Sequence, residues 1–299
     1  MKNAVTIDLE DYYQVSAFSK DVDQWDSYPS RIEHNTERLL SILDEGGTRA
    51  TFFTLGWVAK KYPKLVREIA DRHHEVACHS NVHRSVYAMG ADEFREDTLL
   101  AKRLLENVTG MPVRGYRAPS FSIKRNSLWA FEILAELGFS YDSSVFPIKH
   151  PNYGWPRAPR FPFKINTGRG SIIEFPMPTL QLGGVRAPIG GGAYLRLLPY
   201  WYTRWGIRYI NGGEDRSACV YLHPWEIDSE QPRMRVSISA RLRHYFGLQG
   251  FESKFRRLLR DFELQPLGSL IGELESHPLP TTCNGVPEVR LSELGHYLC

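Results

Sequence analysis

The stretch ATFFTLGWVAKKYPKLVREIADRHHEVACHSNVH, residues 50–83, decides the fold of this chain. It begins with an apolar run at 50–55, continues with an amphipathic segment that opens at Pro63, and returns to a strand-like run at 75–78. Proline is favoured at the first position of a helix, and short runs rich in β-branched and aromatic residues are typical of strands. The stretch therefore predicts a strand, a helix over 63–70 and a second strand, which together form a unit of an α/β fold.

The same alternation extends on both sides of this stretch. Strands are predicted at residues 4–7, 115–118, 140–142, 172–175 and 218–222, and helices at 32–43, 92–109, 126–137 and 251–262. Strands that alternate with helices pack as parallel neighbours joined by right-handed crossovers. We therefore expect an α/β fold, either a barrel or a doubly wound sheet.

The length of 299 residues, with 42% hydrophobic and 24% charged, is sufficient to bury one large core. Single α/β barrels commonly run to about 250 residues or more, so we expect one catalytic domain over 1–299. In this division the barrel core comprises 1–145 and 215–230, a loop-rich insertion with many prolines and glycines comprises 146–214, and a C-terminal extension comprises 231–299.

Charge and hydropathy argue against several classes of partner. The net charge of +3 comes from interspersed acidic and basic residues, so no basic surface predicts nucleic-acid binding. No stretch approaches the roughly 20 consecutive apolar residues that span a bilayer, and the N-terminus shows no secretion signal. We therefore expect a cytoplasmic protein without a transmembrane segment.

The four cysteines also fit a reducing compartment. Cys78, Cys219, Cys283 and Cys299 are scattered, with no CxxC spacing. Reduced thiols are therefore expected, and a Cys283–Cys299 disulfide is the alternative.

Two histidines four residues apart, His79 and His83, directly follow one of the predicted strands. An i, i+4 spacing places two imidazoles on one face of a helical turn. The acid cluster Asp8, Glu10 and Asp11 follows the first strand. One carboxylate beside two imidazoles forms a metal site with positions left for water and substrate, which is the arrangement of many hydrolases. A pair of surface histidines without a metal is the alternative.

Further reactive side chains lie at the ends of predicted strands, namely Arg117, Asp142 and His223. In parallel α/β folds the carboxyl ends of the strands converge on one face, and that face carries the catalysis. Reactive residues at the ends of several strands are together stronger evidence for a catalytic site than any single motif. They predict that the acids, the histidines and the arginine form one site.

Four segments, in order, resemble the motifs of the NodB-homology polysaccharide deacetylases, carbohydrate esterase family four: Thr6-Ile-Asp-Leu-Glu-Asp11, His79-Ser-Asn-Val-His83, Arg117-Ala-Pro-Ser-Phe121 and Leu222-His-Pro-Trp225. Gly190-Gly-Gly-Ala-Tyr-Leu-Arg-Leu-Leu-Pro199 and His223-Pro-Trp-Glu-Ile-Asp228 further resemble the subgroup encoded beside exosortase exopolysaccharide clusters. The resemblance implies a distorted (β/α) barrel of about seven strands, fewer than the full eight. It also implies one divalent metal ion, usually zinc, and removal of an N-acetyl group from a sugar.

The resemblance implies roles for the acids of the first motif. Asp8 corresponds to the general base, which takes a proton from the metal-activated water, and a neighbouring acid is the third metal ligand beside His79 and His83. Most members have two adjacent aspartates, whereas this chain has Asp8-Leu-Glu-Asp11, so Glu10 and Asp11 both remain candidates. Side-chain alternation along a strand favours Glu10, and an early turn would bring Asp11 round instead.

The resemblance assigns the general acid to His223, which would protonate the departing amine. An imidazole suits this role because its ordinary pKa, near 6.5, lets it carry and release a proton at working pH. Arg117 is expected to orient Asp8 and to hold it ionised. Asp142 matches the position of an aspartate that tunes the acidic histidine, although the surrounding segment lacks the usual second aspartate and tryptophan.

Substrate contacts are expected from residues next to these motifs. Trp225 offers an apolar wall for the acetyl methyl group or a sugar face, and Tyr116 and Pro119 flank Arg117. The leading hypothesis is a metal-dependent hydrolase that deacetylates amino sugars of an exopolysaccharide or its precursor. The alternatives are an allantoinase-like hydrolase of small amides, from the same superfamily, and a catalytically silent barrel that binds glycan.

Overall fold

The computed structural model describes residues 1–15, 18, 22–150, 153–276 and 288–294. Its main sheet contains β1 (Asn3–Leu9), β2 (Thr51–Thr54), β3 (Glu75–Cys78), β4 (Gly115–Tyr116), β5 (Tyr141–Asp142), β6 (Phe163–Thr167), β7 (Gly170–Glu174), β10 (Cys219–Leu222), β11 (Leu264–Gln265) and β12 (Glu288–Arg290). A separate antiparallel hairpin consists of β8 (Thr179–Leu182) and β9 (Val185–Pro188).

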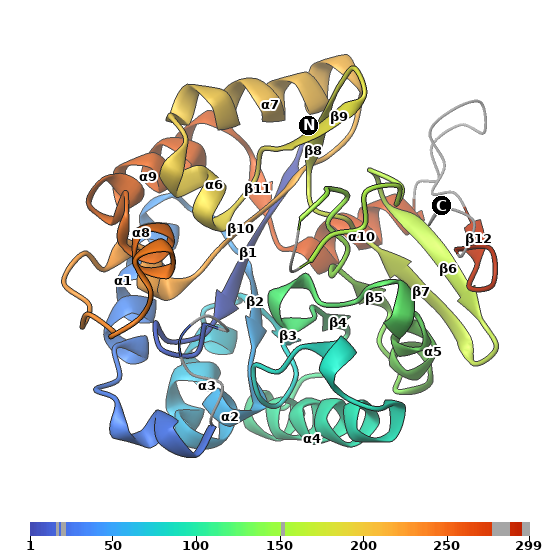
Figure 1. Ribbon diagram of the computed structural model, residues 1–299, viewed down its shortest axis with the longest axis horizontal. Helices are drawn as coiled ribbons and strands as arrows, with labels where there is room; N and C mark the ends of the chain where they lie inside the picture. The colour runs from blue at the N-terminus through green and yellow to red at the C-terminus, as the bar shows by residue number, and fades with distance from the viewer. Residues whose placement is uncertain (16–17, 19–21, 151–152, 277–287, 295–299) are drawn as a thin grey trace.

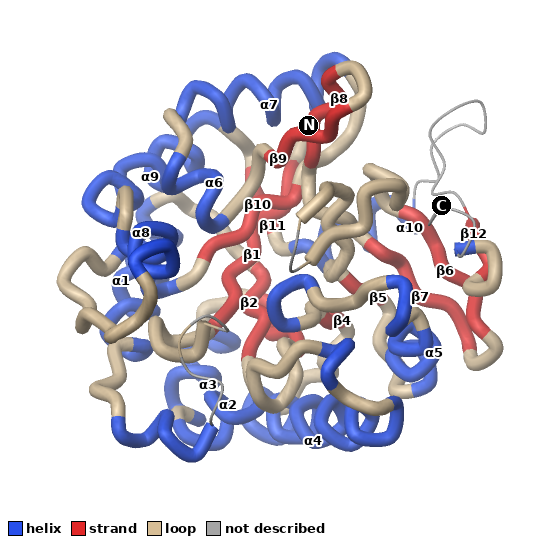
Figure 2. The backbone as a smooth tube through the Cα atoms, viewed as in Figure 1, coloured by secondary structure: helices blue, strands red, loops and turns tan. Residues whose placement is uncertain are grey.

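The helices are α1 (Ile32–Glu45), α2 (Gly56–Lys61), α3 (Pro63–Asp71), α4 (Ala91–Thr109), α5 (Trp129–Glu136), α6 (Gly192–Leu197), α7 (Tyr200–Gly213), α8 (Ile238–Tyr245), α9 (Phe251–Asp261) and α10 (Leu267–Ser276). Short 3-10 turns include η2 (Val86–Ala88), η3 (Pro119–Phe121) and η5 (Pro224–Ile227). Helices α1 to α5 alternate with the first strands and lie around the outside of the sheet (Figures 1 and 2).

The strand order confirms the predicted α/β fold. The sheet runs β10-β1-β2-β3-β4-β5-β7-β6-β12, and β11 pairs with β1 beside this path. The seven strands from β10 to β7 are parallel neighbours, which agrees with the barrel of about seven strands that the resemblance implied. β6 then runs antiparallel to β7. Among the described residues no pairing joins β10 to β7, so the barrel is open there.

Side chains on these strands alternate between two apolar clusters. On β1, Val5 and Ile7 belong to the main core, which the helices cover, whereas Ala4 belongs to a second cluster. Residues in the same register on the other strands complete this second cluster, among them Phe53, Ala77, Tyr141, Cys219 and Tyr221. Because side chains alternate with a period of two, this cluster marks the interior face of the curved sheet.

The register of the strands brings the site positions to one level. Leu9 lies opposite Thr54, Thr54 opposite Cys78, and Cys78 opposite Tyr116. The residues that follow these strand ends therefore leave the sheet at the same edge, as the carboxyl ends of parallel strands do.

Residues 146–214 are more regular than their composition indicated. They contain β6, β7, the β8–β9 hairpin, α6 and α7, and β7 continues the main sheet beside β5. The loop-rich prediction for this segment is therefore only partly correct. β7 gains its hydrogen bonds from the strands on either side of it, β5 and β6. Such tertiary contacts cannot be predicted from the proline and glycine content of the segment.

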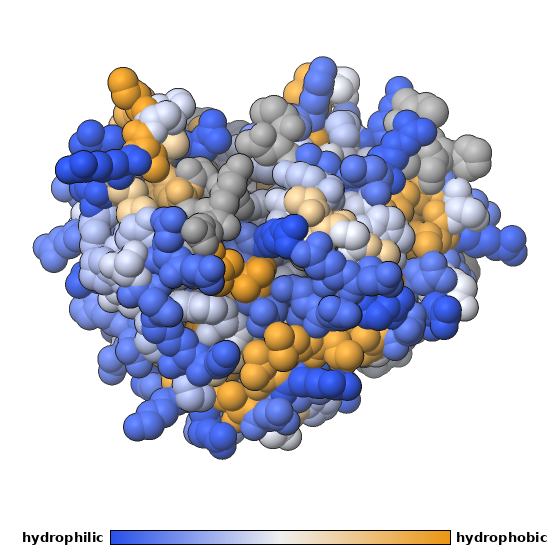
Figure 3. Space-filling view, turned by 60° about the horizontal axis from the view of Figure 1, so that its bottom comes forward, coloured by the Kyte–Doolittle hydropathy of each residue, from blue (hydrophilic) through white to orange (hydrophobic). Residues whose placement is uncertain are grey.

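The exposed face, the helices and the two described cysteines bear on the expectations from composition. The face in Figure 3 is largely hydrophilic, with apolar side chains in several places, among them a band across its lower half. Across the described ranges, every helix is too short or too polar to cross a bilayer. Cys78 and Cys219 are buried and free, as predicted, whereas Cys283 and Cys299 lie outside the described residues.

Gly115 allows β4 to pack against the buried ring of Tyr141. A Cβ atom at this position would lie 2.1 Å from Cζ of Tyr141, so alanine would displace the ring or the strand. We expect Gly115→Ala to lower the free energy of unfolding by about 1–3 kcal/mol, measured by urea denaturation. Gly212→Ala is the control, because a Cβ there meets no atom within 4 Å. Equal losses in both variants would contradict this packing.

Candidate active site

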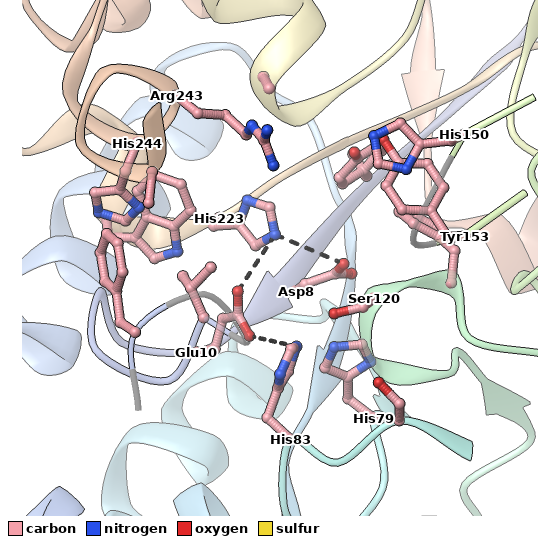
Figure 4. Close-up of a pocket in the computed structure, with 18 of the residues that line it drawn as sticks. Asp8, Glu10, His79, His83, Ser120, His150, Tyr153, His223, Arg243 and His244 are labelled. Atoms are coloured by element: carbon pink, nitrogen blue, oxygen red, sulfur yellow. Dashed lines mark ion pairs between the residues drawn. The ribbon is translucent and has the colours of Figure 1, made fainter. Parts of the chain in front are cut away.

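The carboxyl ends of β1, β3 and β10 open into a cavity of about 420 Å³. We call the part lined by Asp8, Glu10, His79, His83 and His223 the floor of the cavity (Figure 4). The rim is formed by residues from segments beyond the strand ends, namely Tyr87, His150, Tyr153 and Arg243. The cavity has the volume that small-ligand sites commonly have.

Three side chains of the floor form a set that fits a metal ion. Ligand atoms of Glu10, His79 and His83 all lie within 4.8 Å of one another. Oε2 of Glu10 is 2.9 Å from Nε2 of His83. Burial alone would raise the pKa of Glu10, but the charge and hydrogen bond of His83, together with the other histidines, lower it to about 2. Glu10 is therefore ionised and suited to a cation.

His79 is held in the tautomer that a metal ligand needs. Its Nδ1 lies 2.7 Å from the backbone carbonyl oxygen of Arg117. A carbonyl oxygen only accepts, so Nδ1 carries the proton and Nε2 keeps its lone pair. Burial lowers the pKa of His79 to about 4, which keeps the ring neutral.

The two histidines meet in an irregular loop, so the predicted helical turn at 79–83 is wrong. Their ring centroids are 5.4 Å apart, and no helix is present at these residues. His79 continues the interior-facing series of β3, and Ser80 then adopts a left-handed conformation with φ of 66°. The turn at Ser80 therefore brings His83 back to the cavity, and no helical turn is needed for the two histidines to lie close together.

Asp11 is not part of the metal set. Its Oδ2 accepts hydrogen bonds from the backbone N–H groups of Arg31 and Ile32 and from the Ser30 hydroxyl, at 2.8, 3.2 and 2.7 Å. These groups lie at the start of α1, where orphan N–H donors favour a carboxylate. Of the two candidates that the sequence left open, Glu10 is the one that lies with the histidines, whereas Asp11 stabilises the start of a helix.

Asp8 and Arg117 form a buried ion pair on the interior face. Nη1 of Arg117 donates to Oδ1 of Asp8 at 2.7 Å. Arg117 is fully buried and also donates to Thr6, to Ser143 and to Sγ of Cys219. The structure therefore brings both residues to the place that the sequence predicted.

His223 faces the floor from the end of β10. Its Nε2 lies 3.4 Å from Oε1 of Glu10 and 4.0 Å from Oδ2 of Asp8. Its Nδ1 lies 3.1 Å from the carboxylate of Glu226, whose other oxygen accepts from Nε of Arg196 at 3.1 Å. Burial alone would lower the pKa of His223, but the hydrogen bond to Glu226 and the charges of Glu10, Glu226 and Asp8 raise it to about 9.

Asp142 does not contact His223, so its predicted role is wrong. Tyr141 belongs to the interior cluster, so Asp142 points to the opposite face of β5. There it accepts from the hydroxyl and the backbone N–H of Ser144, at 2.7 and 3.0 Å. It also shares a hydrogen bond with Glu174, and burial raises the pKa of Glu174 well above its ordinary value.

Two of the three predicted substrate contacts lie elsewhere. Tyr116 faces the main core, and its hydroxyl lies 2.6 Å from Oγ of Ser80. Pro119 is buried, and the cavity is lined by the two residues after it, Ser120 and Phe121. The predictions for Tyr116 and Pro119 are therefore wrong.

Trp225 does line the cavity, but both of its faces are covered. The ring of His223 stacks on one face at 4.9 Å and the ring of His244 on the other at 4.1 Å. Trp225 therefore holds the orientation of the His223 ring, and its faces are not available to a sugar.

Sequence reasoning missed Glu226, Arg196 and the strained wall of the cavity. Glu226 follows His223 by three residues, a spacing that a 3-10 turn brings together, and this signal was present in the sequence. Ser120 and Phe121 both have positive φ, of 55° and 50°. Left-handed non-glycine residues are uncommon and cluster at functional sites.

Glu10 and Asp11 can be separated by experiment. Glu10→Ala should weaken zinc binding by about 100-fold or more, since loss of a ligand costs at least as much as loss of a supporting residue. Asp11→Ala should keep the zinc affinity and lower the free energy of unfolding by about 1–2 kcal/mol. Isothermal titration and urea denaturation give the two readouts, and the reverse pattern would contradict the assignment.

The partner of His223 is tested by its titration in the metal-free protein. Glu226→Gln removes a negative charge beside Nδ1, so the pKa of His223 should fall below about 9. Asp142→Asn is the control and should leave this pKa unchanged. NMR of the imidazole resonances against pH measures both, and a shift in the Asp142 variant alone would be inconsistent with the contacts described.

Comparisons with known proteins match two adjacent segments of the chain. Residues 23–141 match the polysaccharide deacetylase family, and residues 143–271 match a domain of unknown function, DUF3473. The first segment contains His79, His83 and Arg117, and the second contains His223, Glu226 and Arg243. Both matched segments therefore contribute to one cavity.

Two curated relatives show the same similarity over shorter lengths. A peptidoglycan-N-acetylglucosamine deacetylase of Bacillus cereus is 32% identical over 98 residues, which are 32% of this chain and 36% of the relative. A chitooligosaccharide deacetylase of Sinorhizobium fredii is 32% identical over 100 residues, which are 33% of this chain and 44% of the relative. The chain thus spans less than half the length of each.

A solved structure extends the comparison to the whole fold. The crystal structure of a candidate polysaccharide deacetylase from Mycobacterium smegmatis covers 92% of this chain and 91% of its own, with a TM-score of 0.58 and 20% identity. At that identity the likeness concerns the fold alone. Residues 23–141 thus match the polysaccharide deacetylase family, and the chain as a whole shares its fold with this solved structure.

Proposed function

We propose that the protein is a metal-dependent hydrolase that removes N-acetyl groups from amino sugars of an exopolysaccharide or its precursor. The observation that carries the proposal is the convergence of a Glu10, His79 and His83 ligand set with Asp8 and His223 in one cavity. The relatives named as deacetylases of peptidoglycan N-acetylglucosamine and of chitooligosaccharides support an N-acetylated amino sugar as substrate.

The ligand set fits one divalent cation, and zinc above all. Two neutral imidazoles and one carboxylate are a common zinc triad that leaves a position open. The ionised state of Glu10 and the neutral state of His79 are the protonation states that such ligands need. When bound, the cation would supply a water that is activated near neutral pH and would polarise the acetyl carbonyl.

In this proposal Asp8 acts as the general base. Its Oδ1 is occupied by the guanidinium of Arg117, which leaves Oδ2 directed to the cavity side, 4.0 Å from Nε2 of His223. A carboxylate with one oxygen fixed and one oxygen free accepts a proton in a defined direction. Arg117 therefore acts as the positioning residue for Asp8.

In this proposal His223 acts as the general acid. The carboxylate of Glu226 accepts the hydrogen bond from Nδ1, so the proton on Nε2 is the one that faces the floor. With a pKa of about 9 the ring is protonated at neutral pH and can donate to the departing amine. The stack of Trp225 between His223 and His244 restricts rotation of the ring.

Acetate release from acetylated oligosaccharides tests the proposal. The zinc-loaded protein should release acetate from chitooligosaccharides, and a chelator should abolish the release, which added zinc restores. His79→Ala should lower the rate by about 100-fold or more because it removes a ligand. His34→Ala is the matched control, since His34 is exposed on α1 away from the cavity.

Two results would contradict the proposal. The first is acetate release that survives both the chelator and the His79 substitution. The second is a folded, zinc-loaded protein that hydrolyses allantoin and releases no acetate from any acetylated glycan, which would favour the small-amide hydrolase.

A further inference from the structure

The charges of the cavity are divided between its floor and its rim. The two carboxylates that line the cavity, Asp8 and Glu10, lie on the floor, and each has a cationic or histidine partner there. Two arginines also line the cavity, Arg196 and Arg243. Arg196 is already engaged, since it contacts Glu226 and donates to the carbonyl of Phe246 at 2.7 Å.

Arg243 reaches the cavity from α8. Ala240, Arg243 and His244 line the cavity, a spacing that places them on one face of the helix. The opposite face carries exposed Ile238 and Leu242. The Arg243 side chain extends from α8 into the cavity on the side of His223 (Figure 4). Its direction is therefore set by the helix.

The guanidinium of Arg243 has no anionic partner in the described part of the chain. No carboxylate of those residues lies within 4.0 Å of it, whereas Arg117 is paired with Asp8 and Arg196 with Glu226. Arg243 is exposed at the mouth of the cavity, and a carboxylate or phosphate suits its guanidinium best because such a group accepts two parallel hydrogen bonds.

A second cation lies near the same rim. Nζ of Lys124 is 4.3 Å from the ring centroid of Tyr87, which lines the cavity. Burial lowers the pKa of His150, and the charges of Arg243 and Lys124 lower it further. Both cations therefore act on one rim residue, and this part of the rim is positive.

We propose that Arg243 binds an anionic group, a carboxylate or a phosphate, carried by the unit next to the sugar that is deacetylated. The substrate is accordingly an acidic glycan or a phosphorylated precursor. This inference rests on the proposed function, because it places the reacting sugar on the floor. A neutral glycan would leave Arg243 without a counter-charge.

The test compares acidic substrates with neutral ones. Oligosaccharides that alternate N-acetylglucosamine with glucuronate provide the carboxylate, UDP-N-acetylglucosamine provides the phosphate, and chitooligosaccharides are neutral. The ratio of kcat/KM for the acidic over the neutral substrate should exceed one. Arg243→Gln should lower that ratio by about tenfold, as expected for loss of a charge-assisted hydrogen bond. The acidic substrate whose ratio falls further in Arg243→Gln, the glucuronate oligosaccharide or the UDP-sugar, identifies the anion as a carboxylate or a phosphate.

Arg241→Gln is the matched control, because Arg241 is exposed on the same helix and does not line the cavity. It should change neither kcat/KM nor the ratio. Binding of the same compounds to the metal-free protein gives a readout that does not require turnover, and Arg243→Gln should weaken the acidic ones by about tenfold.

The two proposals fail in different ways. Equal kcat/KM for acidic and neutral glycans, with a ratio that Arg243→Gln leaves unchanged, would overturn the role of Arg243 and leave the deacetylase intact. Absence of acetate release, with Arg243-dependent binding of the acidic compounds, would overturn the deacetylase and support the anion site. Acidic compounds that bind no better than chitooligosaccharides to the metal-free protein would also overturn the anion site.

Discussion

The arrangement of the site depends on the buried guanidinium of Arg117. A buried charge is stable only where it is paired and hydrogen-bonded. Asp8 supplies the opposite charge, and Thr6 and Ser143 supply further acceptors from neighbouring segments. The backbone carbonyl of the same residue accepts from His79. One arginine thus orients the proposed base through its side chain and a proposed metal ligand through its main chain. The positions of Asp8 and His79 therefore both depend on Arg117.

Much of the fold follows from local patterns in the sequence. The helices at 32–43, 63–70, 92–109 and 251–262 and the strands between them were predicted near their observed bounds, because apolar periodicity and proline or glycine boundaries act locally. Parallel strands then bring their carboxyl ends together, so Asp8, Arg117 and His223 meet as expected. The convergence of distant residues was thus predictable from topology alone.

The errors have a common physical origin. A strand end shows which residues are near the site, but which face each side chain takes depends on the register, and this separates Arg117 from Tyr116 and places Asp142 outside the cavity. Loop conformation decided the rest, since the turn at Ser80 replaces the expected helix and the start of α1 takes Asp11. Contacts between distant segments, such as that of Arg196 with Glu226, leave no local pattern to find.

The claim that Glu10, His79 and His83 hold a single cation is tested most directly by anomalous diffraction at the zinc edge from crystals grown with zinc. The account predicts one strong peak on the floor of the cavity, with Nε2 of both histidines at about 2.0–2.1 Å and a carboxylate oxygen of Glu10 at about 2.0–2.2 Å. Zinc bound elsewhere, or ligated by Asp11 in place of Glu10, would contradict it.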